Sequence, residues 1–450
     1  MIKNNFIKYV VNPIGWSLIK GSKRFKYYKQ YEKKQWNSPE KQLEEQKKNL
    51  YNLVSYAHKK IPYYQKIIKN KKITYSQKTI LEDIKKFPIL TKQLIRENFN
   101  DLINPNIKAK RNTSGGSTGE QVILMQDKSM SDHNAATKVL YDEWAGKLEG
   151  DLLIKLWGSE SDVLKGSMGF KGFLVKNLTN TIILNAYKMS EKNMREYIDI
   201  INKLKPKLIL SYVQSAFEIS RYINENNIKV YSPKSFMTSA GTLSPHMEIA
   251  IEKAFNCKTF NRYGSREVGD MACECEKHEG LHINLLTQHL EILDDTLKPV
   301  NNEDTGEIYI TYLHNYAMPL IRYKIGDRAS FSNKKCSCGR SFPLLKEISG
   351  RVGCTLKTKK GALDSTALTT SFYFYESIRK YQLRQKGEEF LIKVVIDPKK
   401  DWETDKKNLK SKLEDIFGEG TKFTFEVVDE IEPSKSGKYL YLINENEFNK

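Results

Sequence analysis

The sequence predicts a two-domain α/β protein, in which a large α/β domain precedes a small α+β domain. Three observations predict it. The chain has 450 residues, enough for two or three separate cores. Between Gly150 and Pro245 short apolar runs alternate with amphipathic helical segments, as in a sheet covered by helices. After Arg351 the pattern changes to strand, helix and strand over about 100 residues, a normal size for a small domain.

These patterns divide the chain into a basic N-terminal arm (1–37), a large domain (38–350) and a small mobile domain (351–450). A long helix is expected after Ser38-Pro39, where a capping residue precedes a proline and leucines then recur at helical spacing. Ile61-Pro62 should end it. The other expected elements are strands at 152–154, 181–184, 207–210, 291–293, 306–312, 389–396 and 422–428, and helices at 190–203 and 405–417.

Composition excludes several classes of protein. The hydrophobic share of 39% and the charged share of 28% exclude collagen and a mostly disordered chain. Six cysteines are too few for a disulfide framework, which favours the reducing cytoplasm. The formal net charge of +20 suggests nucleic acid or an anionic membrane as a partner. Because lysine is scattered along the whole chain and no nucleic-acid-binding motif occurs, we expect no nucleic acid partner.

The basic excess is greatest at the N-terminus. Residues 1–35 contain nine basic residues and one acidic residue, with apolar side chains between them and Pro13 interrupting any single helix. Such a segment favours peripheral contact with an anionic membrane, here the inner face of the cell membrane. The alternative is an arm packed on the protein's own surface.

A glycine-rich loop is expected at Asn112–Glu120, where four hydroxyl residues and three glycines precede an apolar run. Glycines allow backbone amides to turn toward an anion, and hydroxyls add donors, so this loop fits a polyphosphate. It differs from the common phosphate loop, because no lysine follows Gly119. A flexible surface loop would have a similar composition.

Five later segments give this loop a context. They are Ser239-Ala240-Gly241-Thr242, Tyr263-Gly264-Ser265-Arg266-Glu267, Tyr323-Lys324-Ile325-Gly326-Asp327, Gly350-Arg351 and Pro433-Ser434-Lys435-Ser436-Gly437-Lys438. In this order and spacing they resemble the adenylate-forming (ANL) superfamily, and within it the phenylacetate–CoA ligase branch with its CapK-like members. The resemblance extends from about Leu50 to the C-terminus.

The resemblance implies an AMP-forming ligase whose large domain binds Mg²⁺, ATP and a carboxylic acid and whose small domain carries a catalytic lysine. The acid would be activated as an acyl-adenylate and then transferred to CoA. A carrier protein or an amino-sugar is an alternative acceptor, with a role in surface-polysaccharide biosynthesis. The acid itself is not specified, and we expect its pocket near residues 158–172, 212–217 and 239–242.

The resemblance also implies roles for individual residues. Lys438 would act on the acyl carboxylate and the α-phosphate, Glu267 would hold Mg²⁺, and Arg351 would support the ribose or phosphates. Tyr263 would stack on adenine, and Asp327 would bind both ribose hydroxyls. The remaining nucleotide-binding residues would be Thr113, Ser114, Gly115, Gly116, Ser117, Thr118, Gly119, Ala240, Gly241, Gly264 and Ser265.

A structural zinc site is expected from the cysteines. Cys275 and His278 have chelate spacing, and Cys336 and Cys338 form a second pair 61 residues after Cys275. Three thiolates and one imidazole make a closed tetrahedral zinc site. His282 competes with His278 for the fourth position, Cys273 is an alternative to Cys275, and buried reduced thiols are the alternative to a metal.

Two other functions remain as alternatives. A nucleic-acid-binding protein would show steeply salt-dependent binding of random duplex. A membrane-docked scaffold of the same fold would bind vesicles without acid-dependent chemistry. The presence of Glu267, Asp327 and Lys438 together favours the enzyme.

Overall fold

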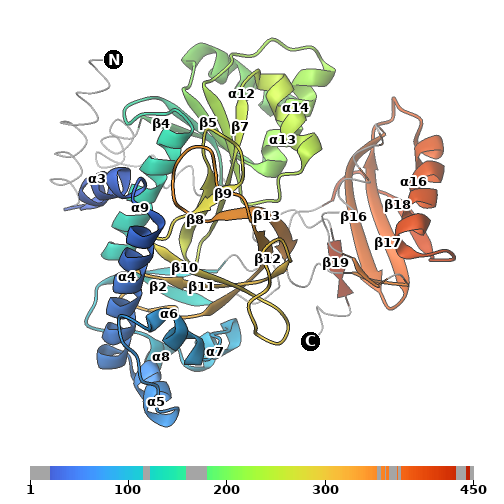
Figure 1. Ribbon diagram of the computed structural model, residues 1–450. Helices are drawn as coiled ribbons and strands as arrows, with labels where there is room; N and C mark the ends of the chain where they lie inside the picture. The colour runs from blue at the N-terminus through green and yellow to red at the C-terminus, as the bar shows by residue number, and fades with distance from the viewer. Residues whose placement is uncertain are drawn as a thin grey trace. The chain divides into compact units, whose positions relative to one another are not determined.

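The computed structural model describes residues 21–114, 122–158, 180–351, 356–359, 361–363, 372, 375, 377–431 and 442–445 (Figure 1). The chain divides into two compact units, a large one that ends at Glu347 and a small one that comprises Ile348–Lys450 together with the short stretch Gly326–Ala329. The mixed α/β class predicted from the sequence is confirmed.

The large unit is built on an eleven-stranded sheet in the order β10-β11-β12-β13-β9-β8-β7-β6-β5-β3-β4. The strands from β4 to β7 are parallel, and β8 and β9 continue the sheet in antiparallel pairing. Their bounds are β3 Leu153–Leu156, β4 Thr181–Leu184, β5 Leu208–Tyr212, β6 Ser235–Ser239, β7 Lys258–Ser265, β8 Gly269–Glu274, β9 Leu281–Ile283, β10 Gln288–Leu293, β11 Gly306–Tyr312, β12 Tyr323–Phe331 and β13 Leu344–Arg351.

The helices come before and between these strands in the sequence. Ser38 caps α4 by accepting a hydrogen bond from the Lys41 amide, and the helix ends before Pro62, as predicted. The helices are α3 Arg24–Lys34, α4 Pro39–Lys60, α5 Pro62–Asn70, α6 Ile80–Asp83, α7 Lys92–Glu97, α8 Phe99–Leu102, α9 Lys128–Trp144, α12 Glu191–Leu204, α13 Val213–Glu225 and α14 Pro245–Phe255, with a 3₁₀ turn, η2, at Ile84–Lys86.

Each face of the parallel strands has its own hydrophobic core. Side chains alternate along a strand, so Leu153 of β3 joins the core beneath α9 and α3, whereas Ile154 joins the core beneath α12, α13 and α14. Both faces are apolar because both are covered, which explains the short continuous apolar runs in the sequence.

Helix α3 belongs to the first of these cores. Phe25, Tyr28 and Tyr31 are buried against α9. This part of the predicted basic arm therefore packs on the large unit, and residues 1–20 lie outside the described ranges. No helix in the described part of the chain is long and apolar enough to span a membrane.

The small unit has a four-stranded sheet in the order β18-β17-β16-β19, with α16 along one face (Figure 1). Leu409, Leu413 and Phe417 of α16 pack on Leu383 and Ile392 of the sheet. The elements of the small unit are β14 Leu356–Thr358, β15 Gly361–Leu363, β16 Ile378–Lys386, β17 Glu389–Ile396, α16 Trp402–Phe417, β18 Phe423–Val427 and β19 Leu442–Asn444. Strands β14 and β15 pair with each other and are not part of the four-stranded sheet. The predicted strand, helix and strand after 389 are confirmed.

Candidate functional site

The predicted phosphate loop joins two strands of a hairpin, β1 (Ala109–Thr113) and β2 (Ile123–Asp127). Its base is closed by two hydrogen bonds: the Ser114 amide donates to the Val122 carbonyl at 2.9 Å, and the Val122 amide donates to Ser114 Oγ at 3.0 Å. Ser114 is buried, and Thr113 ends β1. The candidate residues Gly115, Gly116, Ser117, Thr118 and Gly119 lie outside the described ranges.

This hairpin is tied to the motif that contains Glu267. Gln126 Nε2 donates to the Arg266 carbonyl at 2.7 Å, and Asn112 Nδ2 donates to the same carbonyl at 3.4 Å. Asn112 also donates to Gln126 Oε1 at 3.0 Å. The two bonds to the Arg266 carbonyl link positions more than a hundred residues apart in sequence, so they bring the base of the loop beside the predicted Mg²⁺ ligand.

The motif itself consists of the last three residues of β7 and the start of the turn that leads to β8. Tyr263 and Glu267 are buried, and the Ser265 hydroxyl accepts from the Val268 amide at 3.3 Å. A Cβ at Gly264 would lie 2.8 Å from Asp270 Oδ1 and 2.9 Å from the Gly269 carbonyl, so only glycine fits. The pairing of β7 with β8 shifts register between Tyr263 and Gly264, and such bulges often re-aim side chains next to sites.

Neighbouring candidate residues follow the carboxyl ends of the parallel strands. Ala240 and Gly241 come directly after β6, and Ala240 has φ +62°, a left-handed conformation that a non-glycine residue adopts at a cost. A Cβ at Gly241 would lie 3.1 Å from Val213 Cβ. Trp157 and Gly158 follow β3 in the same way. Ligands of open α/β sheets bind at this edge, where the strand ends converge.

The other predicted residues are distributed as follows. Asp327 is a buried residue of β12. Arg351 ends β13, although its side chain is not among those described. Lys438 lies outside the described ranges. Its catalytic role, like the roles of Asp327 and Arg351, stays a prediction.

The metal-ligating side chains come together in one cluster. Ligand atoms of Cys275, His282, Cys336 and Cys338 all lie within 4.8 Å of one another. Cys275 Sγ and Cys336 Sγ are 3.6 Å apart, and Cys338 Sγ is 3.4 Å from His282 Nε2. In a tetrahedron with Zn–S of about 2.3 Å and Zn–N of about 2.0 Å, such edges would be about 3.8 and about 3.5 Å. The donor set therefore fits a closed zinc site.

His282 rather than His278 completes this cluster. Burial lowers the pKa of His282 to about 4, so the imidazole is neutral at pH 7, as a ligand must be. Its Nδ1 lies 3.4 Å from the Phe342 carbonyl, which leaves Nε2 for the metal. His278 instead lies beside Glu274, with its Nδ1 3.5 Å from the carboxylate. Cys273 is buried but is not one of the clustered ligands.

Arg340, which sequence reasoning did not single out, supports the cluster from outside. Its backbone amide donates to Cys338 Sγ at 3.4 Å, and its guanidinium lies over the rings of Trp36 and Trp144 at 4.6 and 4.8 Å. The guanidinium also donates to Gln35 Oε1 at 2.9 Å and to both oxygens of Glu276. The only feature of the sequence that could have indicated this role is the position of Arg340 directly after the Cys-x-Cys-Gly sequence.

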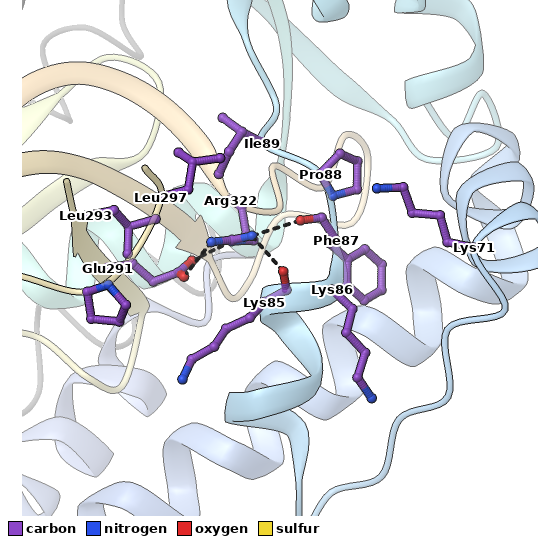
Figure 2. Close-up of a pocket in the computed structure, with 11 residues that line it drawn as sticks. Lys71, Lys85, Lys86, Phe87, Pro88, Ile89, Glu291, Leu293, Leu297 and Arg322 are labelled. Carbon is purple, nitrogen blue, oxygen red and sulfur yellow. Dashed lines mark hydrogen bonds and ion pairs between the residues drawn. The ribbon is translucent and has the colours of Figure 1, made fainter. Parts of the chain in front are cut away.

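A cavity of about 280 Å³ lies elsewhere in the large unit, between η2 and β10. Figure 2 shows Arg322 among the lining residues, bonded to both oxygens of Glu291 and to the carbonyls of Lys85 and Phe87, and these bonds are 2.9–3.0 Å long. The side chains of Lys85 and Lys86 point away from this guanidinium. Because Arg322 has all these partners within the chain, we assign the cavity no ligand.

Comparison with known proteins adds to this geometry. Residues 356–445 match the family model of the CapK C-terminal domain. Protein CapK of Staphylococcus aureus is 28% identical over 396 residues, which cover 87% of this chain and 86% of that one. A phenylacetate-coenzyme A ligase of Thermus thermophilus is 25% identical, covering 68% of this chain and 69% of that one.

A solved structure of 2-hydroxyisobutyryl-CoA ligase in the postadenylation state has the same fold, with a TM-score of 0.70, 16% identity and coverage of 89% of both chains. The sequence relatives span most of this chain, and the family model covers its C-terminal part. By its sequence relatives and its fold, the chain is similar to the CapK-like adenylate-forming ligases over most of its length.

Proposed function

We propose that this protein activates a carboxylic acid with Mg·ATP and transfers the acyl group to CoA. In the first step a carboxylate oxygen bonds to the α-phosphorus of ATP, and pyrophosphate leaves. In the second step the thiol attacks the acyl carbon of the adenylate, and AMP leaves with the bonding electron pair while the thiol proton passes to solvent or a base. Both steps balance without any redox partner.

The roles of the residues follow from their chemistry. The loop after Ser114 supplies amides and hydroxyls for the phosphates, and Glu267 supplies one hard oxygen ligand, which suits Mg²⁺ held mainly by phosphate oxygens and water. Tyr263 offers a ring to adenine, and Asp327 offers two acceptors to the ribose. Lys438 would stabilise the charge that develops between the acid and the α-phosphate.

One observation supports this proposal most strongly. Asn112 and Gln126, on either side of the loop, both donate to the Arg266 carbonyl. The residue after this carbonyl is Glu267, which is buried. A phosphate-binding loop and a Mg²⁺ ligand must be adjacent if one Mg·ATP is to contact both. These hydrogen bonds hold the loop's flanks and the Glu267 turn together before any ligand binds.

We further propose that the Cys275, His282, Cys336 and Cys338 cluster binds a structural zinc ion. Three thiolates and an imidazole fill a tetrahedron and leave no open position for a substrate. The ion would therefore stabilise the large unit and would not take part in acid activation.

Acid-dependent ATP–pyrophosphate exchange without CoA tests the activation step. We expect exchange with at least one acid from a panel of aryl acids, fatty acids and amino acids. Lys438→Ala should reduce it by about 100- to 1,000-fold, as for one preorganised donor, while Mg·ATP still binds. A matched control is Lys435→Ala, three positions earlier in the sequence. Full exchange by Lys438→Ala would contradict the role of Lys438, and absence of Mg·ATP binding by the wild type would contradict the whole proposal.

The acceptor is tested in the same system. We expect CoA to release AMP stoichiometrically with thioester once the correct acid is present. Release of AMP with an amino-sugar or a phosphopantetheinylated carrier protein, but not with CoA, would replace CoA by that acceptor and would support the predicted role in surface-polysaccharide biosynthesis for the sugar.

A further inference from the structure

A group of polar side chains lies on the face of the large sheet that α9 covers, near the carboxyl ends of the parallel strands. It consists of Tyr141 of α9, Lys155 of β3, Trp157, Arg262 of β7 and Asp270 of β8, and we call it the Arg262 cluster. Arg262 precedes Tyr263, and alternation along the strand directs it to the opposite face. The Arg262 guanidinium lies 5.9 Å from the centroid of the Trp157 ring.

The polar atoms of this cluster are buried but poorly satisfied. Arg262 is 5% exposed and Tyr141 is fully buried. Arg262 Nε is 3.6 Å from Asp270 Oδ1, which is an ion-pair distance and too long for a hydrogen bond. Within the described part of the chain, Arg262 Nε, Asp270 Oδ2 and the Tyr141 hydroxyl have no hydrogen-bond partner. An unpaired polar atom is unfavourable when it is buried, so three in one place require an explanation.

The cluster also has an excess of positive charge. Lys155 has no carboxylate within 4 Å among the described residues, whereas the nearby Asp142 is paired with Lys147 at 3.3 Å. Burial and the repulsion of Lys138 lower the pKa of Lys155 to about 8, with Asp142 opposing and Arg262 and Lys147 adding to the repulsion. An added anion would relieve this repulsion and would supply acceptors to Arg262 and Tyr141.

The position of the Arg262 cluster indicates that this anion is part of the acid substrate. Trp157 follows β3 at the strand-end edge where Ala240 and Tyr263 also lie, and we expect the acid to bind along this edge, as ligands of open α/β sheets do. The Arg262 cluster lies on the α9 side of the same edge. An acid whose reacting carboxylate faces the nucleotide would direct its other end toward Trp157 and Arg262.

We propose that the acid activated by this protein carries a second anionic group, a carboxylate or a similar oxyanion, and that Arg262 and Lys155 bind it. The inference rests on the proposed activation of a carboxylic acid. Arg262 would be the specificity-determining residue, since a site built to pair with a charged group discriminates strongly against a substrate that lacks it.

The test compares matched acids in ATP–pyrophosphate exchange. Straight-chain monocarboxylates of four to eight carbons and phenylacetate are each paired with the acid that has a second carboxylate at the far end. At one or more lengths, we expect kcat/KM to favour the dicarboxylate by about 10- to 100-fold, as one or two charge-assisted hydrogen bonds provide. Arg262→Met should abolish this ratio, and Arg262→Lys should restore part of it.

Because Arg262→Met leaves Asp270 without its cation, Arg262→Met/Asp270→Asn is the second variant, and it should also lose the preference. Exchange that favours the monocarboxylate at every length, or a ratio unchanged in both variants, would overturn the inference while leaving acid activation in place. No exchange with either series would overturn acid activation as well, so the two failures are distinguishable.

Discussion

Arg340 and Arg262 are two arginines of the large unit that are equally buried, with side chains 7% and 5% exposed, and each lies beside a tryptophan. Arg340 lies between two indole rings and donates to Gln35 and Glu276. Arg262 has one indole and one carboxylate at 3.6 Å, and its Nε has no hydrogen-bond partner in the described ranges. The chain satisfies the first guanidinium and leaves the second incompletely satisfied.

This difference separates an arginine that stabilises the fold from an arginine that is available to bind a ligand. Arg340 holds Gln35, at the end of α3, beside Cys338 of the metal cluster, so its contacts join parts of the fold. Arg262 makes few contacts that connect parts of the fold. Its burial lowers the stability of the protein, and a bound anion would offset this loss. Proteins commonly accept such a cost at sites that bind substrate. Arg322, bonded to Glu291 and to two carbonyls, resembles Arg340 in this respect.

The metal cluster should give the largest effect. Cys336→Ser removes one of three thiolates, so we expect loss of bound zinc and a lower free energy of unfolding. A metal present at a thousand times its Kd contributes about 4 kcal/mol. Zinc content by elemental analysis and unfolding in denaturant measure the two effects together. Cys257→Ser is the control, since Cys257 lies outside the cluster. A wild type without zinc that is as stable as the zinc-loaded protein would contradict the site.

The second-largest effect should be the difference between the two arginine–carboxylate pairs in their contribution to the free energy of unfolding. Arg340→Met/Glu276→Gln removes both charges of one pair but also the two indole contacts and the bond to Gln35, and should lower the free energy of unfolding by about 2 kcal/mol. Arg262→Met/Asp270→Asn should change it by less than about 1 kcal/mol, because apolar or neutral replacements of a poorly compensated buried pair are nearly neutral. Denaturant midpoints measure both, and equal losses would erase the comparison.

Much of the candidate site could be proposed from the sequence because its residues are contiguous. The turn from Tyr263 to Glu267 and the hydroxyls of the loop are contiguous motifs, whose spacing reports the chemistry directly. Asp327 was proposed in the same way. Arg262 carried a weaker signal, a charge within a strand whose neighbours are buried, and a strand charge is usually solvated.

The sequence did not indicate the features that depend on which distant segments pair in the folded chain. His278 has the shorter spacing from Cys275, but β9 pairs with β8 on one side and β13 on the other, and this pairing brings His282 to the thiols that precede β13. The bonds from Asn112 and Gln126 to the Arg266 carbonyl span 154 and 140 positions. No local pattern indicates a partner at that distance. The expected zinc ligand therefore remained open between two histidines until the strands were placed.

Lys155 should give a smaller effect, with a definite pH dependence. Its pKa is lowered to about 8 in the folded protein, so the unfolded chain binds this proton more tightly. The charged Lys155 thus costs stability below about pH 8, and the cost falls as the pH rises toward about 10. Lys155→Met should therefore raise the thermal midpoint at pH 7 and raise it less at pH 9.5. Lys192→Met, at an exposed position of α12, is the control, and an increase independent of pH would contradict this explanation.

The most direct measurement compares wild type, Arg340→Met and Arg262→Met in ATP–pyrophosphate exchange with one matched pair of acids, a dicarboxylate and its monocarboxylate. The account predicts that Arg340→Met keeps the wild-type preference for the dicarboxylate, although it is less stable, whereas Arg262→Met loses that preference. A preference that survives in Arg262→Met, or one that falls equally in both variants, would contradict it.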